Sequence, residues 1–190
     1  MAPKHVAQFK SLVTEGFYDG LDFYRVIEEF VAQCGDLDNS KASQHSGELL
    51  AEFSRSSQDN SGFLLLQSPD FIAPQTGFLQ GLPPGRDPQS SQEWLLHCPG
   101  ALAMARSMDA NRADFYVVIG QATRHLDRNM STFGRIIYGM SLIQSLQRAA
   151  LDNADGIIKD PTKRSKILSA RLATELSIKQ RLAVQVQDER

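Results

Sequence analysis

The sequence predicts a mainly β domain, because short strand-like runs outnumber helical ones. Runs rich in aromatic and β-branched residues recur between turn residues, and only two segments space their apolar residues as a helix does. Many short strands with two helices favour an antiparallel barrel or sandwich over an α/β sheet. At 190 residues, 42% of them hydrophobic, the chain suits one domain with a substantial core.

The first helix is expected to begin at Pro3, which is tolerated in a first helical turn. Apolar residues then recur at helical spacing over 6–13, until Gly16 ends the pattern. Two strand-like runs follow, at 21–27 and 30–34, with Glu28 and Glu29 between them. This arrangement predicts a β-hairpin.

The middle of the chain, 36–96, is polar and interrupted by glycine and proline. It is predicted to be a long loop insertion that carries a few short strands. Later elements are expected as strands at 101–106, 115–120 and 132–137, a second helix at 141–148 and a strand at 167–173. Residues 1–175 therefore form the expected domain, with a charged tail at 176–190.

Charge and composition argue against several classes of protein. The net charge is −2 and the basic residues are scattered, so we expect no nucleic-acid partner. No apolar run is long enough to cross a bilayer, so we expect no membrane insertion, and the first residues lack the features of a secretory signal. Cys34 and Cys98 are too few for a disulfide framework, and whether they pair is open. We expect no metal and no cofactor.

Conventional catalytic motifs are weak in this sequence. No nucleophile elbow or activated-cysteine context accompanies the serine, histidine and aspartate residues. The segment 36–40 begins like a calcium loop but lacks the required glycine and glutamate, so we expect a solvated turn. Glu28 and Glu29 point to opposite sides of an extended chain and are expected to be exposed.

The hairpin carries a more specific combination. Alternation brings Arg25, Ile27 and Gln33 to one surface, together with Phe30 or Val31. A cation and an amide would then lie beside aromatic and aliphatic groups. On this pattern alone, a strand arginine is usually a surface ion-pair partner and Phe30 a core residue.

The run 16–36 closely resembles the signature of cyclophilins. Residues 100–106 are similar to the central strand of that family, and 111–119, 126–127 and 133–135 continue the resemblance in the right order. It covers roughly residues 3–148. Segments at 85–88, 94–98 and 124–129, and the tail around 160–161 and 167–172, resemble a proteobacterial branch whose members are often exported.

The resemblance implies a cyclophilin-like antiparallel barrel capped by two helices. Such barrels normally have eight strands, and the first two would precede the helix that begins at Pro3. We therefore expect a chain truncated at its N-terminus or a start site placed too late. The protein would be periplasmic if an upstream signal is missing from this chain, and cytoplasmic otherwise.

The resemblance also implies peptidyl-prolyl cis-trans isomerase activity on proline-containing polypeptides, by a monomer. Arg25 matches the catalytic arginine of the family, Gln33 the amide that orients the substrate backbone, and Ala105 with Arg106 the edge that binds the peptide chain. The apolar pocket for the proline ring is matched by Phe30, Val31, Val118, Leu126 and Met130.

Four positions depart from the family pattern. Val118 replaces an aromatic wall, His125 a tryptophan and Met130 a histidine, while Tyr116 replaces a polar substrate contact. His125 is expected to be a rim residue without a catalytic role. These departures leave an alternative open, a catalytically weakened or inactive module that binds proline peptides, and a third possibility is a chain that folds poorly and does neither.

Overall fold

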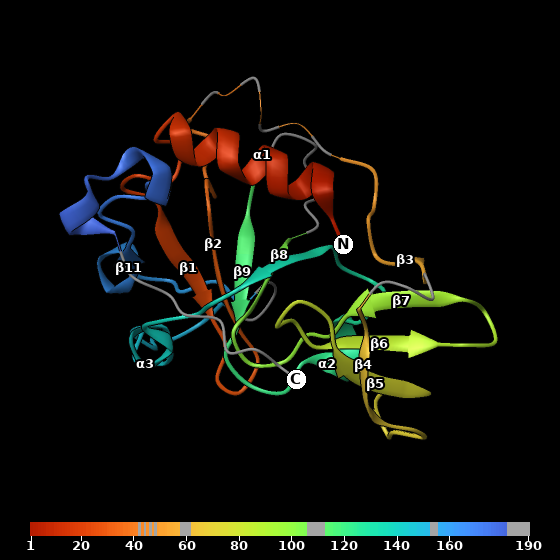
Figure 1. The fold of residues 1–190 in the computed structure, drawn as a ribbon. Coiled ribbons are helices and arrows are strands. Elements are labelled where there is room, and N and C mark those ends of the chain that lie inside the picture. The colour runs from red at the N-terminus through yellow and green to blue at the C-terminus, as the bar shows by residue number, and fades with distance from the viewer. Residues whose placement is uncertain are drawn as a thin grey trace.

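Two antiparallel β-sheets form the body of the molecule (Figure 1). The computed structural model describes residues 1–41, 43, 45, 47, 49–57, 62–105, 113–152 and 156–181. The larger sheet has six strands in the order β10-β8-β9-β2-β1-β11. Its strands are β1 (Asp22–Val26), β2 (Val31–Gly35), β8 (Ala101–Met104), β9 (Phe115–Val118), β10 (Thr132–Arg135) and β11 (Ser165–Lys166). Within the described residues, the edge strands β10 and β11 are not paired with each other, so this sheet is open.

Helix α1 (Pro3–Thr14) confirms the predicted first helix, and it crosses above the upper ends of β1, β2 and β9 in Figure 1. Its residues Leu12 and Val13 pack into the main core. Its first turn contains no acidic residue, and Glu52 from the insertion supplies one instead. The Glu52 carboxylate accepts hydrogen bonds from the amides of Lys4 at 3.2 Å and His5 at 3.0 Å. A negative charge at this position stabilises a helix N-terminus.

Strand alternation divides the larger sheet into two buried faces. The face toward α1 packs into the main core, with Phe23, Val26, Ala32, Cys34, Met104, Phe115 and Val117. The opposite face contributes to a second cluster, with Val31, Ala101, Ala103, Tyr116 and Val118. Because successive strand residues point to opposite sides, β2, β8 and β9 are largely apolar on both, with Gln33 as a polar residue on β2.

The predicted hairpin is confirmed as β1 and β2, which pair antiparallel. Glu29, in the turn between them, has a left-handed φ of 55°, and the turn rests on the end of β9. The amide of Ile119 donates to the Phe30 carbonyl at 2.9 Å, and that of Gln121 to the Glu29 carbonyl at 3.2 Å. A Cβ atom added to Gly120 would lie 1.9 Å from the Glu29 carbonyl oxygen, so only glycine fits there.

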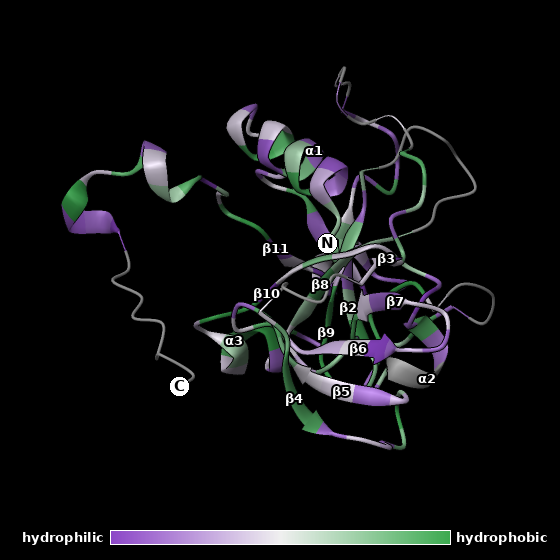
Figure 2. Ribbon diagram, turned by 45° about the vertical axis from the view of Figure 1, so that its right-hand side comes forward, coloured by the Kyte–Doolittle hydropathy of each residue, from purple (hydrophilic) through white to green (hydrophobic). Residues whose placement is uncertain are grey.

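The insertion contains a second sheet, which is more structure than the sequence predicted. Its five strands lie in the order β3-β7-β6-β5-β4. They are β3 (Arg55–Ser56), β4 (Leu64–Gln67), β5 (Gln75–Phe78), β6 (Pro84–Asp87) and β7 (Gln92–Leu95). A fully buried Glu93 holds three of them together through ion pairs of 2.8 Å with Arg55 and Arg86. Figure 2 shows the apolar strand β4 at the outer edge, where Leu65 and Leu66 are mostly exposed.

The C-terminal part differs from the prediction in two ways. The second capping helix, α3 (Met140–Gln144), is shorter than the expected 141–148, and the strand predicted at 167–173 is wrong. Among the described residues of this part, the strand that joins the larger sheet is β11, which pairs with β1. Short 3-10 helices occupy Pro161–Lys163, Ala173–Glu175 and Ile178–Gln180. Ile167 exchanges two backbone hydrogen bonds with Gly20 and Leu21, after which the chain leaves the sheet.

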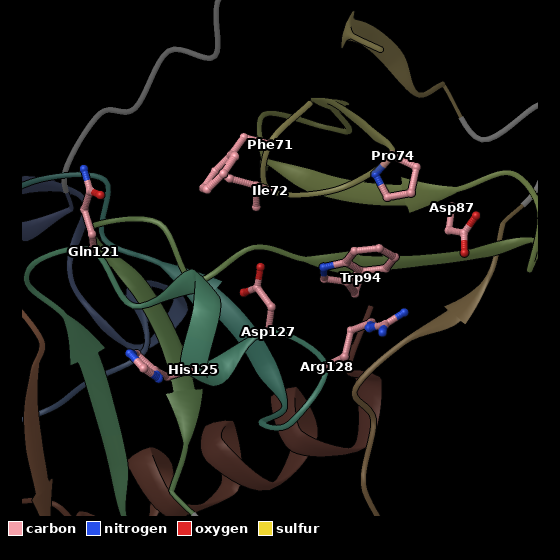
Figure 3. A pocket seen from close by; sticks show the side chains of 9 residues that line it. All are labelled: Phe71, Ile72, Pro74, Asp87, Trp94, Gln121, His125, Asp127 and Arg128. Carbon is pink, nitrogen blue, oxygen red and sulfur yellow. The ribbon is translucent and has the colours of Figure 1, made fainter. Parts of the chain in front are cut away.

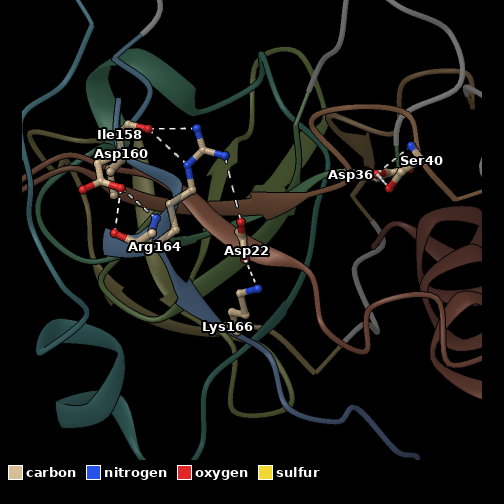
Figure 4. Close-up of polar contacts among 8 residues, drawn as sticks. Asp22, Asp36, Ser40, Ile158, Asp160, Arg164 and Lys166 are labelled. Carbon is tan, nitrogen blue, oxygen red and sulfur yellow. Dashed lines mark hydrogen bonds and ion pairs between the residues drawn. The ribbon is translucent and has the colours of Figure 1, made fainter.

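Ion pairs attach this C-terminal part to β1 (Figure 4). Asp22 faces Arg164 at 3.9 Å and Lys166 at 4.0 Å. Arg164 also donates to the Ile158 carbonyl at 3.1 and 2.9 Å. The same view shows Asp36 accepting from the Ser40 hydroxyl at 2.8 Å, which closes the turn at 36–40 that the sequence predicted.

Replacement of Gly120 by alanine is expected to destabilise the fold by about 2 kcal/mol or more, because a methyl group would collide with the backbone of Glu29. Thermal or urea unfolding measures the loss. Gly134→Ala is the matched control, since a Cβ atom there would meet its nearest neighbour, Leu102, at 3.7 Å. Equal stabilities of the two variants would contradict this account of the turn.

Docking of the C-terminal segment is expected to weaken at acid pH. The Ala170 amide and then the Arg171 guanidinium lower the pKa of Asp19 from its ordinary value of 3.8. A lowered pKa means that this contribution is complete above 3.8 and is lost as the pH falls through the folded-state pKa. Asp19→Asn should reduce hydrogen-exchange protection of the Ala170 amide severalfold at neutral pH, whereas Asp38→Asn should leave it unchanged. Unaltered protection in the Asp19 variant would refute the assignment.

Candidate functional site

An apolar cluster covers the face of the larger sheet that lies opposite α1. Val31 and Val118 are direct partners on β2 and β9, and the short helix α2 (Thr123–Leu126) places Leu126 over them. Val118 is fully buried, whereas Phe30, Ala105 and Met130 are partly exposed at its margin. The structure thus brings together six of the predicted substrate-binding residues: Phe30, Val31, Ala105, Val118, Leu126 and Met130.

Arg25 and Gln33 lie side by side along the β1–β2 ladder, where they are direct partners. The Arg25 guanidinium donates to the Gln33 side-chain oxygen at 3.3 Å. The Gln33 side-chain nitrogen donates to the Tyr24 hydroxyl at 2.5 Å, and that hydroxyl donates to Asp114 at 2.6 Å. This sequence of donors and acceptors fixes which way the Gln33 amide faces, so its oxygen is directed at Arg25.

The buried Asp114 anchors this chain of hydrogen bonds. Its second carboxylate oxygen accepts from the amide of Asp36 at 3.1 Å. The carboxylate occupies the space above Gly35, where an added Cβ atom would lie 1.7 Å from it. Tyr24 and Asp114 were not predicted as site residues, because they are 90 residues apart and no local spacing connects them. The glycine at the end of β2 was the one available signal, since a close approach by another group is a common reason for glycine there.

The predicted peptide-binding edge is only partly described. The Ala105 amide donates to the Asp114 carbonyl at 2.9 Å, so it is not available to a substrate. Arg106 lies outside the described residues.

Tyr116 is buried on the same face, in a second hydrogen-bond network. Its hydroxyl lies 2.9 Å from Nε2 of the fully buried His97, whose Nδ1 lies 2.8 Å from Asp127. The Thr132 hydroxyl is 3.1 Å from the same Nε2. Burial, and then the Asp127 carboxylate, raise the pKa of Tyr116, so its hydroxyl stays protonated. The network therefore joins β9 and β10 to the end of α2.

His125 lies exposed on α2, next to Phe30. The two rings meet edge to face, with their centroids 6.3 Å apart. Its rim position agrees with the sequence expectation, and the absence of a catalytic role stays a prediction.

Other classes of site find no support among the described residues. They contain no group of three or more potential metal ligands, and Cys34 and Cys98 are free thiols. Burial, and then the Asp114 carboxylate, raise the pKa of Cys34 and make it a poor nucleophile. No helix in the described ranges is long and apolar enough to cross a membrane.

Comparison with known proteins identifies the family. The model of cyclophilin type peptidyl-prolyl cis-trans isomerase/CLD matches residues 1–172. A probable peptidyl-prolyl cis-trans isomerase from Brucella abortus (strain 2308) is 28% identical over 165 residues, which span 86% of this chain and 69% of the relative. The isomerase CYP23 of Arabidopsis thaliana is 27% identical over 171 residues, 89% of this chain and 61% of that protein.

Among solved structures, the cyclophilin AquaCyp293 from Hirschia baltica is similar, with a TM-score of 0.74 and 26% identity. The similarity covers 95% of this chain and 69% of that one. The Brucella and Hirschia proteins also agree with the proteobacterial branch that the sequence indicated. The chain belongs to the cyclophilin-type peptidyl-prolyl cis-trans isomerases.

Proposed function

We propose that this protein catalyses rotation about X-Pro bonds and that Arg25 is its catalytic residue. The observation that carries the proposal is the position of the Arg25 guanidinium, which is oriented by Gln33 on the same sheet face as the apolar cluster. A fixed cation beside an apolar surface suits a substrate that is a neutral ring joined to a polar amide.

The chemistry follows from the amide bond. An X-Pro peptide bond rotates slowly because conjugation holds it planar, with a barrier of about 18–20 kcal/mol. Donation by the Arg25 guanidinium to the prolyl nitrogen favours the twisted amide, in which the nitrogen lone pair is no longer conjugated. Since that interaction is stronger in the transition state than in the planar ground state, it accelerates exchange.

The apolar cluster would hold the proline ring during rotation. Phe30 and Met130 offer partly exposed apolar surface, and they pack against the cluster that contains the buried Val31, Val118 and Leu126. The Gln33 amide, already fixed by Tyr24, would hold both Arg25 and the substrate backbone. This preorganisation spares the site from reorienting dipoles as the bond twists.

A second candidate function is binding of proline peptides without catalysis. Val118 leaves an aromatic wall out of the cluster, and the Tyr116 hydroxyl is within hydrogen-bonding distance of His97. Both features weaken positioning of the ring, and neither affects Arg25. The two candidate functions are therefore distinguished by whether the protein accelerates cis-trans exchange of a bound peptide.

We also propose that the open six-stranded sheet corresponds to the antiparallel barrel of the family without its first two strands. In support, β10 and β11 end the sheet order on opposite sides, which leaves two edges that a further pair of strands would join.

Exchange of a short Ala-Pro peptide, followed by NMR, tests the catalytic role. The parent is expected to accelerate cis-trans exchange, and Arg25→Ala to lose about 10²–10³-fold of that acceleration. Arg25→Lys should recover little, because an ammonium lacks the planar fork. Arg148→Ala, which removes a partly exposed arginine paired with Glu28, is the matched control and should retain activity. A folded parent that binds the peptide without accelerating exchange would support the binding module instead.

Tyr116→Phe tests whether this residue is structural. We expect the free energy of unfolding to fall by about 1–2 kcal/mol, because the hydroxyl bonded to His97 is removed, while the exchange rate per folded molecule stays unchanged. Thr132→Val removes the other hydroxyl next to His97 and should act in the same way. A large loss of exchange rate with stability preserved would instead place the Tyr116 hydroxyl on the substrate.

A further inference from the structure

A cavity of about 680 Å³ lies between the second sheet and the segment that follows β9 (Figure 3). Phe71, Ile72 and Pro74 form one wall. Trp94 on β7 forms the other, together with Asp127 and Arg128 just after α2. None of these six residues belongs to the predicted substrate site.

The Trp94 side chain is held firmly beside this cavity. It is 96% buried by the rest of the protein, and the Arg128 guanidinium carbon lies 5.0 Å from its ring centroid. Its indole packs against Gly85, where an added Cβ atom would lie 2.9 Å from two ring carbons. Yet the indole nitrogen has no hydrogen-bond partner among the described residues. In Figure 3 the nitrogen-bearing end of the ring faces the space beside Asp127, below Ile72.

An unpaired buried N–H is costly, so its orientation points to an acceptor supplied by a ligand. The charges around it are mixed, because Asp87 and Asp127 accompany Arg128. This balance disfavours a free anion and suits a neutral acceptor such as a peptide carbonyl.

The opposite wall offers apolar surface to solvent. Phe71 is 89% exposed and Ile72 44%. Their turn is nevertheless fixed, since Asp70 accepts from the Ile72 amide at 2.9 Å and from the Thr76 hydroxyl at 2.6 Å. A preformed wall with exposed aromatic surface is typical of a binding site.

The cavity adjoins the candidate isomerase site. His125 lines the cavity and also packs edge-on against Phe30. The next residue, Leu126, belongs to the apolar cluster of the site, and Asp127 after it again lines the cavity. Three consecutive residues thus connect the two sites.

We propose that this cavity binds the arm of the proline-containing polypeptide that leaves the isomerase site past His125. A large apolar side chain of that arm packs beneath Phe71 and Ile72, and a backbone carbonyl accepts the Trp94 indole N–H. This inference rests on the proposed function and adds a preference for an aromatic residue near the proline.

Trp94 provides the readout, because it is the single tryptophan of the chain. Binding is measured by its fluorescence with nine-residue peptides that have a central proline. One peptide has phenylalanine three residues before the proline, one has it three residues after, and a reference has alanine at both positions. Three extended residues span about 10 Å, which allows an arm to reach a neighbouring site. Exchange at the proline is followed by NMR in the same samples.

One of the two phenylalanine peptides is expected to bind about tenfold more tightly than the reference and to shift the Trp94 emission. Phe71→Ala should abolish this advantage without affecting the reference peptide. Phe78→Ala, which removes another partly exposed phenylalanine of the second sheet, outside this cavity, is the matched control and should retain the advantage.

Equal affinities for all three peptides, or an advantage that survives Phe71→Ala, would overturn the cavity proposal even if exchange is accelerated. A Phe71-dependent advantage without accelerated exchange would support the cavity and reject the isomerase activity. The two proposals can therefore fail independently.

Discussion

Burial of both faces of β2, β8 and β9 is the constraint on which the rest of the structure depends. One face closes the main core under α1, and the other carries the apolar cluster of the candidate site. Because strand side chains alternate, a shift of one residue in the register of β2 would exchange Val31 and Gln33 with Ala32 and Cys34. The core and the site are therefore specified by the same register, and the site cannot be displaced without disrupting the core.

Hydrogen bonds among the polar side chains of this sheet orient the residues of the candidate site. Asp114 fits above Gly35 and orients Tyr24, which orients Gln33 and through it Arg25. The network around His97 does the same for the end of α2, where the candidate site and the Trp94 cavity meet. Each buried polar group in these networks has a partner, whereas the Trp94 indole N–H has none among the described residues. The unpartnered indole N–H is the reason we infer that the cavity binds a ligand with a hydrogen-bond acceptor.

Sequence patterns correctly predicted the elements that are formed by residues close together in the chain. Pro3 and the apolar spacing after it gave α1, and the runs on either side of Glu28 and Glu29 gave the hairpin. The same patterns failed for elements that are stabilised by residues far away in the sequence. The second sheet consists of strands of two to four residues, and three of them are held together by the buried Glu93 and its two arginines, so its sequence looks like a loop. The apolar run after Lys166 looked like a strand, but the chain leaves the sheet after Ile167, and the Ala170 amide donates to the Asp19 carboxylate instead.

By itself, the sequence determined the mainly β class, the hairpin and, through its family signature, the residues gathered around Arg25. The class and the hairpin follow from short-range spacing, which a linear pattern records, whereas the residues expected around Arg25 come from the resemblance to the family. Only the tertiary structure decided that Asp114 and Tyr24 orient the site, that Tyr116 is engaged near His97, and that Phe71 lies opposite Trp94. These relations join residues about 20 to 90 positions apart, and their energy comes from burial and complementary donors and acceptors that exist only after the chain has folded.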